Sequence, residues 1–172
     1  SLIGKKLTVI AWLWARTVKS PNPAFSHIEV PLASSFILSA KEGKEVWLQP
    51  VIHGENYNFE IRLGKPVKEA LEGTKVGRGG HFRCIMSGSA IHVDYIREQG
   101  KLGKIGQRLM AIVTEGPKGR CYLQATKDVE FIAKKATPSW RPELDINYNP
   151  RDIRPQLYGL TKYADLFTSR QL

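Results

Sequence analysis

The sequence is poor in the residues that would assign it to a specialised class of protein. Only two of its 172 residues are cysteine, Cys84 and Cys121, which excludes a disulfide scaffold and fits a reducing cytoplasm. The longest apolar run, residues 9–15, is far shorter than the ~20 residues that a membrane-spanning helix needs. Because no charged segment followed by an apolar one opens the chain, we expect no signal peptide and no membrane partner.

Acidic residues are also scarce. The chain has 16 Asp and Glu against 26 Lys and Arg, a net charge of +10. Clustered Lys and Arg attract polyanions, so an excess of this size indicates a nucleic acid as the partner without proving it. The hydrophobic content of 42 % excludes an intrinsically disordered chain, and the length corresponds to one domain or to one domain with an appendage.

The hydrophobic pattern predicts a β-rich α+β fold of mostly antiparallel strands and hairpins with two or three short helices. The apolar stretch 7–18 is typical of a strand buried on both faces. Further strands are expected at 28–32 and 35–38 and in hairpins 45–52/57–63, 82–93 and 109–114/120–124. In 57–63 apolar and polar residues alternate, so Tyr57, Phe59, Ile61 and Leu63 are expected on a buried face. Short helices are expected at 66–71, 95–99 after the cap Asp94, 127–136 after the cap Thr126 with Val129, Ile132 and Ala133 on its inner face, and 162–166. The β-rich domain comprises residues 1–136, and residues 137–172 form a proline-rich arm with a short C-terminal helix.

No grouping of residues indicates catalysis or a bound cofactor within this chain. The four histidines, His27, His53, His81 and His92, are scattered, and no Ser/Cys–His–Asp set accompanies them. The glycine-rich segments 77–80 and 103–106 match neither a P-loop nor a dinucleotide-binding motif. Residues 22–25, Asn-Pro-Ala-Phe, superficially resemble the catalytic loop of N6-adenine methylases, but alanine replaces the second proline.

Basic residues near two glycine-rich loops are the candidates for contact with a nucleic acid. Exposed backbone N–H groups beside cations suit a phosphate backbone. Solvated loops whose lysines serve only solubility are the alternative. The candidate DNA-binding residues are Arg78, Arg83, Lys101, Lys104, Arg108, Lys118 and Arg120.

Two turns that are distant in the sequence have the form of zinc knuckles. The segment from Ser20 to Phe25, Ser-Pro-Asn-Pro-Ala-Phe, has the shape of Cys-Pro-Asn-Pro-x-Cys, and the segment from Cys84 to Gly88 has that of Cys-Pro-x-Cys-Gly. Two such knuckles make a zinc ribbon with four thiolate ligands. Here the ligand positions hold Ser20, Phe25, Cys84 and Ser87, so we expect no bound zinc, although His27 and His81 could substitute as ligands. Packing of Phe25, Phe82 and Met86 would then replace the metal.

These turns and several other segments resemble the large bacterial adenine-specific DNA methylases that contain an inserted zinc ribbon. The similar segments occur in the same order along nearly the whole chain, at residues 11–18, 20–23, 31–36, 94–103, 108–113, 119–123, 157–160 and 166–172. The resemblance implies that the chain is an internal part of a longer enzyme. In that family the glycine-rich S-adenosylmethionine motif lies upstream of this region and the Asp-Pro-Pro-Tyr catalytic loop lies downstream.

The resemblance implies a role in a bacterial restriction-modification or phage-defence system. The parent enzyme would transfer a methyl group from S-adenosylmethionine to adenine N6, whereas this chain alone would be inactive and would bind no cofactor. It would contact DNA as an accessory domain beside the catalytic domain of the same parent chain. The alternative is a non-catalytic structural or protein-docking domain that binds no DNA.

Overall fold

A long N-terminal strand organises the fold of this protein, whose computed structural model describes residues 4, 6–117, 119–148 and 154–172. The first sheet has the strand order β2-β1-β8-β9, and all its strand pairs are antiparallel. Its strands are β1 (Val9–Lys19), β2 (Glu29–Pro31), β8 (Gly106–Gly116) and β9 (Gly119–Gln124). The long strand is central, as the sequence predicts, but its neighbours are antiparallel and its first two residues are exposed.

A second, three-stranded sheet is built from the hairpin that alternation predicts. β4 (Val46–His53) pairs in register with β5 (Asn56–Leu63), and β3 (Ile37–Ser39) flanks β4. Tyr57 and Phe59 lie on the buried face of β5, as expected from their spacing. The prediction is wrong for Leu63, which is 80 % exposed because the strand leaves the core at its end.

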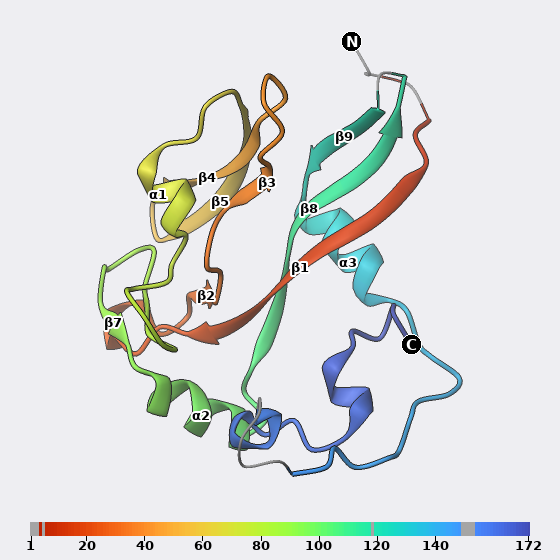
Figure 1. The fold of residues 1–172 in the computed structure, drawn as a ribbon. Helices are drawn as coiled ribbons and strands as arrows, with labels where there is room; N and C mark the ends of the chain where they lie inside the picture. Colours follow the sequence, from red (N-terminus) through yellow and green to blue (C-terminus); the bar gives the residue numbers. More distant parts are fainter. Residues whose placement is uncertain (1–3, 5, 118, 149–153) are drawn as a thin grey trace.

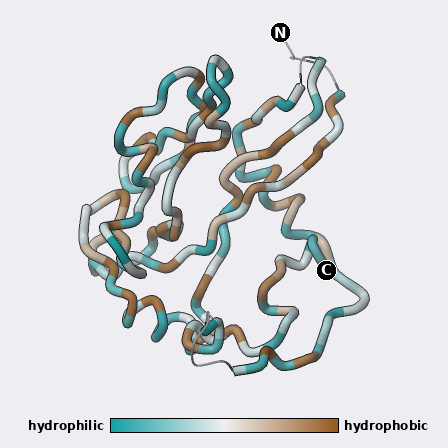
Figure 2. Tube along the Cα trace, in the orientation of Figure 1, coloured by the Kyte–Doolittle hydropathy of each residue, from teal (hydrophilic) through white to brown (hydrophobic). Residues whose placement is uncertain are grey.

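The core lies between these two sheets. Met110 and Ala111 of β8 pack in one cluster with Leu48 and Phe59 of the three-stranded sheet. Figure 1 shows the two sheets beside each other, with α3 (Lys127–Lys134) following β9. Lys127 and Glu130 of α3 line a hollow together with Phe59 of β5 and Met110 of β8. Residues 109–114 of β8 are buried, whereas residues 11–16 of β1 are half-buried. Figure 2 shows the hydrophobic residues along both strands.

The helices are short and differ in detail from the sequence predictions. Thr126 caps α3 as expected, accepting a hydrogen bond from the Val129 N–H at 3.3 Å. α2 (Val93–Lys101) begins two residues earlier than predicted. Asp94, the predicted cap, instead lies in the first turn of the helix and forms an ion pair with Arg97. Ile132, predicted on the inner face of α3, is 56 % exposed. α1 (Lys68–Glu72) is a single turn, and no helix in the described part of the chain has the length and apolar character needed to cross a membrane.

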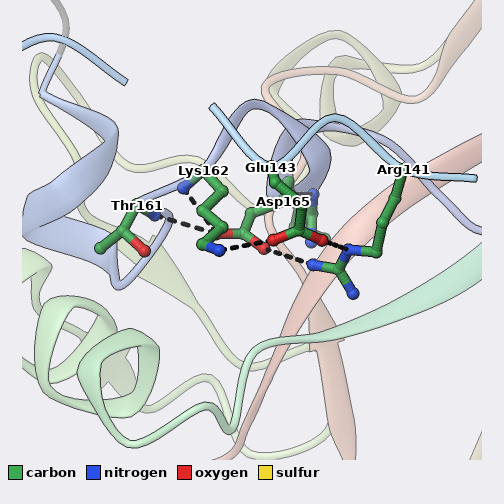
Figure 3. Close-up of polar contacts among 6 residues, drawn as sticks. Arg141, Glu143, Thr161, Lys162 and Asp165 are labelled. Atoms are coloured by element: carbon green, nitrogen blue, oxygen red, sulfur yellow. Dashed lines mark hydrogen bonds and ion pairs between the residues drawn. The ribbon is translucent and has the colours of Figure 1, made fainter. Parts of the chain in front are cut away.

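The segment after α3 folds back along the base of the molecule. It contains two 3-10 turns, η2 (Pro155–Tyr158) and η3 (Tyr163–Leu166), the second near the predicted helix 162–166. Figure 3 shows a cluster of ion pairs in which Lys162 contacts Glu143, and Arg141 contacts both Glu143 and Asp165. Within the cluster the hydrogen bond and charge of Lys162 lower the pKa of Glu143. The cluster therefore ties residues 141–143 to residues 162–165.

Candidate nucleic-acid interface

The two knuckle-like turns meet in the structure. The first contains the 3-10 turn η1 (Pro23–Phe25), and the second joins β6 (Phe82–Arg83) to β7 (Ala90–Ile91). The Asn22 side chain of the first turn donates to the Ser89 hydroxyl of the second at 3.4 Å. Sixty-seven residues separate these partners in the sequence, so only the tertiary fold brings the turns together.

Cys84 occupies the centre of this contact and is 1 % exposed. Burial raises the pKa of its thiol, but hydrogen bonds from the Ser20 and Ser87 hydroxyls and from the backbone of Ser87 and Met86 outweigh that effect. The thiol pKa therefore lies below its ordinary value. Phe25, at the remaining ligand position, packs against the core cluster to which Cys84 belongs.

The residues around Cys84 do not fit a zinc ion. Serine hydroxyls and a phenyl ring replace three of the four thiolates that a structural zinc site requires. Within the residues that the structure describes, no three His, Cys, Asp or Glu side chains are grouped so that they could hold a metal ion. A serine–cysteine hydrogen-bond network thus joins the two turns.

The predicted basic residues lie in several separate places. Lys101 ends α2, and Lys104 lies in the exposed turn after it. Arg78 is exposed in the loop before β6, whereas Arg83 contacts Glu72 at 3.8 Å. Lys118 lies outside the described residues.

Arg108 is engaged inside the protein. Its guanidinium carbon is 4.2 Å from the centroid of the Tyr57 ring, and Nη2 donates to the Tyr57 carbonyl oxygen at 3.0 Å. The Tyr57 hydroxyl in turn donates to the Glu29 carbonyl oxygen at 2.6 Å. Arg108 therefore links β8 to β5, and its replacement would alter the fold as well as the surface charge.

This contact has a measurable consequence for stability at alkaline pH. Burial raises the pKa of Tyr57 to about 12, although the Arg108 charge opposes the increase. In the unfolded chain the phenol ionises near its model value of 10.0. Because the folded state holds the proton more tightly, the free energy of unfolding should decrease between about pH 10 and pH 12, by up to roughly 2–3 kcal/mol. Urea denaturation across this range should show a smaller decrease for Tyr57→Phe, and equal decreases would contradict the prediction.

A cleft between the two sheets brings other basic residues together. It has a volume of about 700 Å³ and lies between the β3–β4 loop, the end of β5 and the start of β9. Lys41 and Lys44 line it from the loop, and Arg120 lines it from β9. All three side chains are exposed, and none forms an ion pair with a carboxylate in the described part of the chain. The lining contains one carboxylate, Glu45, so the charge of the cleft is positive.

The surroundings of the cations include apolar side chains and glycines. Val46, Leu63 and Tyr122 provide apolar surface in the cleft. The Tyr122 hydroxyl donates to the Leu38 carbonyl oxygen at 3.1 Å, which connects β9 to the edge of the three-stranded sheet. Gly119, with a φ of 109°, permits the tight β8–β9 turn beside Arg120. The cleft therefore combines fixed backbone, apolar surface and three cations.

Of the seven predicted basic residues, only Arg120 is found in this cleft among the residues that the structure describes. In the β8–β9 ladder, the backbone of Arg120 lies across from that of Glu115. Glu115 is near one end of β8 and Arg108 is near the other, so roughly 20 Å separates the two arginines at ~3.3 Å per strand residue. The sequence does not single out Lys41 and Lys44, because a glutamate follows each of them and the loop has little net charge. The signal that could have identified them is their place in a glycine-containing turn between two strands.

No protein-family model, curated protein or solved structure matches this chain.

Proposed function

We propose that this chain is a non-catalytic, DNA-contacting domain of an adenine-specific DNA methylase that uses S-adenosylmethionine. The observation that carries the DNA-contacting role is the convergence of Lys41, Lys44 and Arg120 on one cleft. Cations from two sheets, whose backbone is held by β hairpins, can bind successive phosphates with little loss of backbone freedom. The net charge of +10 favours the same class of partner.

The kinship with the methylases is supported by the contact between the two knuckle-like turns. A zinc ribbon requires such turns to meet, and the hydrogen bonds around Cys84 come from the two ligand positions that hold serine. We propose that the domain retains the ribbon arrangement without the metal. The methyl transfer itself would then belong to other parts of the parent enzyme.

Binding to duplex DNA at several salt concentrations tests the DNA-contacting role. For Lys41→Glu/Lys44→Glu we expect a loss of affinity of roughly tenfold or more and a reduction of about two in the slope of log K against log salt, since each phosphate contact contributes ~0.9. The matched control is Lys101→Glu/Lys104→Glu, which changes the net charge equally at exposed positions. Fluorescence anisotropy with a labelled duplex provides the measurement.

The outcomes distinguish the cleft from the end of α2 as the DNA-contacting site, and they also test whether DNA is bound electrostatically. If the control pair lowers the slope and the cleft pair does not, the contact lies at the end of α2. If the wild-type affinity is independent of salt, the electrostatic proposal is wrong. Arg108 is unsuitable for this test because of its contact with Tyr57.

A protein-docking role is the second candidate, and exposed apolar side chains after α3 favour it. Trp140 is 69 % exposed and Leu144 is 73 % exposed. Large exposed apolar side chains are typical of surfaces that contact another protein. Loss of assembly of the parent enzyme in Trp140→Ser/Leu144→Ser, with unchanged DNA affinity, would favour docking over DNA contact.

A further inference from the structure

A second hollow lies far along the first sheet from the basic cleft, between β1, α2 and the C-terminal segment. Its inner chamber has a volume of about 290 Å³. Apart from Arg16 the chamber is lined by nonpolar residues and by the Tyr158 ring: Leu32, Gly80, Phe82, Ile96, Ile105 and Leu160. An outer compartment of about 510 Å³ shares Arg16, Ile105, Tyr158 and Leu160 with the chamber. Arg16 therefore lies at the junction of an apolar space and a polar one.

Arg16 is a half-buried cation with unused hydrogen-bonding capacity. Its Nη2 donates to the Asp165 carbonyl oxygen at 2.6 Å, which uses one of the five N–H groups of the guanidinium. No carboxylate among the described residues forms an ion pair with it. A cation withdrawn from water without a counter-ion is stabilised by any anion that reaches it.

The carboxylate of Asp165 is occupied by other partners. The Asp165 carboxylate accepts hydrogen bonds from the backbone N–H groups of Thr161 and Lys162, and Arg141 lies 3.7 Å from it. Figure 3 shows these contacts of the Asp165 carboxylate. Arg141 also lines the outer compartment, so a second cation is present there.

An unpartnered polar atom lies in the same compartment. Thr168 lines it, and the Oγ1 atom of this residue is buried without a hydrogen-bond partner within the described part of the chain. Buried hydroxyl groups without partners are rare, because each costs about 1–3 kcal/mol. A ligand oxygen in the outer compartment would supply the missing partner once a movement of residues 167–169 exposes the hydroxyl.

We propose that this hollow binds a monocarboxylic acid with an apolar body. The carboxylate would contact Arg16 in the outer compartment, and the hydrocarbon part would fill the inner chamber. The chamber's apolar lining disfavours a nucleobase or a sugar, whose polar atoms would be left without hydrogen bonds. An aliphatic chain and a phenyl ring are both compatible with the apolar lining of the chamber. This site is independent of the DNA-contacting cleft.

Isothermal titration with octanoate and with 3-phenylpropanoate tests the proposal and separates the two kinds of apolar body. Octanamide, which keeps the chain and removes the charge, should bind roughly tenfold or more weakly than octanoate, since a charge-assisted hydrogen bond is lost. Acetate, which keeps the charge and removes the chain, should also bind roughly tenfold or more weakly. Equal binding of octanoate and octanamide, or no saturable binding of either acid, would overturn the proposal.

Two arginine variants locate the site. Arg16→Gln should weaken octanoate binding by roughly tenfold, whereas Arg120→Gln, a matched change in the basic cleft, should leave it unchanged. Because Arg16 also holds the Asp165 carbonyl oxygen, Arg16→Lys serves as a second variant that retains the charge and should bind octanoate better than Arg16→Gln. An unchanged octanoate affinity in a folded Arg16→Gln protein would refute the role of Arg16.

Discussion

Replacing Ser20, Phe25 and Ser87 with cysteine is expected to create a zinc site around Cys84. The Ser20 and Ser87 side chains already lie within hydrogen-bonding range of the Cys84 thiol, so thiolates at these positions would lie close to the separation that a tetrahedral zinc ion requires, with ~2.3 Å zinc–sulfur bonds. A bound zinc ion itself favours the thiolate form of its cysteine ligands. We expect about one zinc per chain by elemental analysis and a thiolate absorption band with cadmium or cobalt.

The energies indicate that zinc would offset the cost of the substitutions. Loss of the partly buried Phe25 ring should destabilise the metal-free variant by roughly 1–3 kcal/mol. Structural zinc sites have apparent binding free energies of about 10–16 kcal/mol at neutral pH. The melting temperature of the triple variant should therefore be below that of the wild type without zinc and above it with zinc.

A matched control isolates the contribution of Cys84. The same triple variant with Cys84→Ser has three introduced thiols and no native one at the site, and both proteins retain Cys121. It should bind zinc far more weakly, because one of four ligands is missing. If the triple variant binds no more zinc than the wild type, the two turns do not have ribbon geometry, and the proposed kinship with the methylases loses its main structural support.

Gly100→Ala is expected to destabilise the protein by roughly 1–3 kcal/mol, although the position is helical. Alanine normally stabilises a helix interior relative to glycine by about 1 kcal/mol. Here a Cβ atom at residue 100 would overlap the Tyr158 carbonyl oxygen and would lie 2.9 Å from the Tyr158 Cα atom. These are backbone atoms, so α2 and η2 would have to move apart, as in other overpacked contacts.

The matched control for Gly100→Ala is Glu98→Ala on the exposed side of the same helix. It should change the free energy of unfolding by about 0.5 kcal/mol or less. Urea denaturation measures both changes, and limited proteolysis after α3 reports whether the C-terminal segment has detached. A Gly100→Ala protein as stable as the wild type, with the same cleavage pattern, would show that residues 155–160 do not rest on α2.

The contrast between Arg108 and Arg120 shows how far sequence reasoning reaches in this chain. Both arginines belong to one basic stretch, and the sequence predicts that both contact DNA. Arg108 stacks on Tyr57, which is fifty-one residues away in the sequence, while Arg120 lines the cleft with Lys41 and Lys44. The sequence shows which residues are cationic. Contact with a distant strand decides which of these cations remain available to bind a phosphate.

Local patterns determined most of the secondary structure. The alternation in residues 57–63, the turn residues at 53–56 and the cap Thr126 act over a few residues, so the hairpin of β4 and β5 and the start of α3 follow from sequence alone. Two apolar residues show where the local pattern fails. Leu63 lies at the end of β5, where the strand leaves the core, and Ile132 lies off the face of α3 that buries Ala133.

By itself the sequence determined a β-rich α+β protein with an excess of positive charge and two knuckle-like turns lacking most of their metal ligands. The tertiary structure alone decided that the turns meet at Cys84, that three cations share a cleft and that Arg16 adjoins an apolar chamber. Strand and turn formation depends on neighbours within a few residues, whereas each of these sites joins segments more than fifty residues apart. Which segments meet depends on how the two sheets and the C-terminal segment bury their apolar faces against one another.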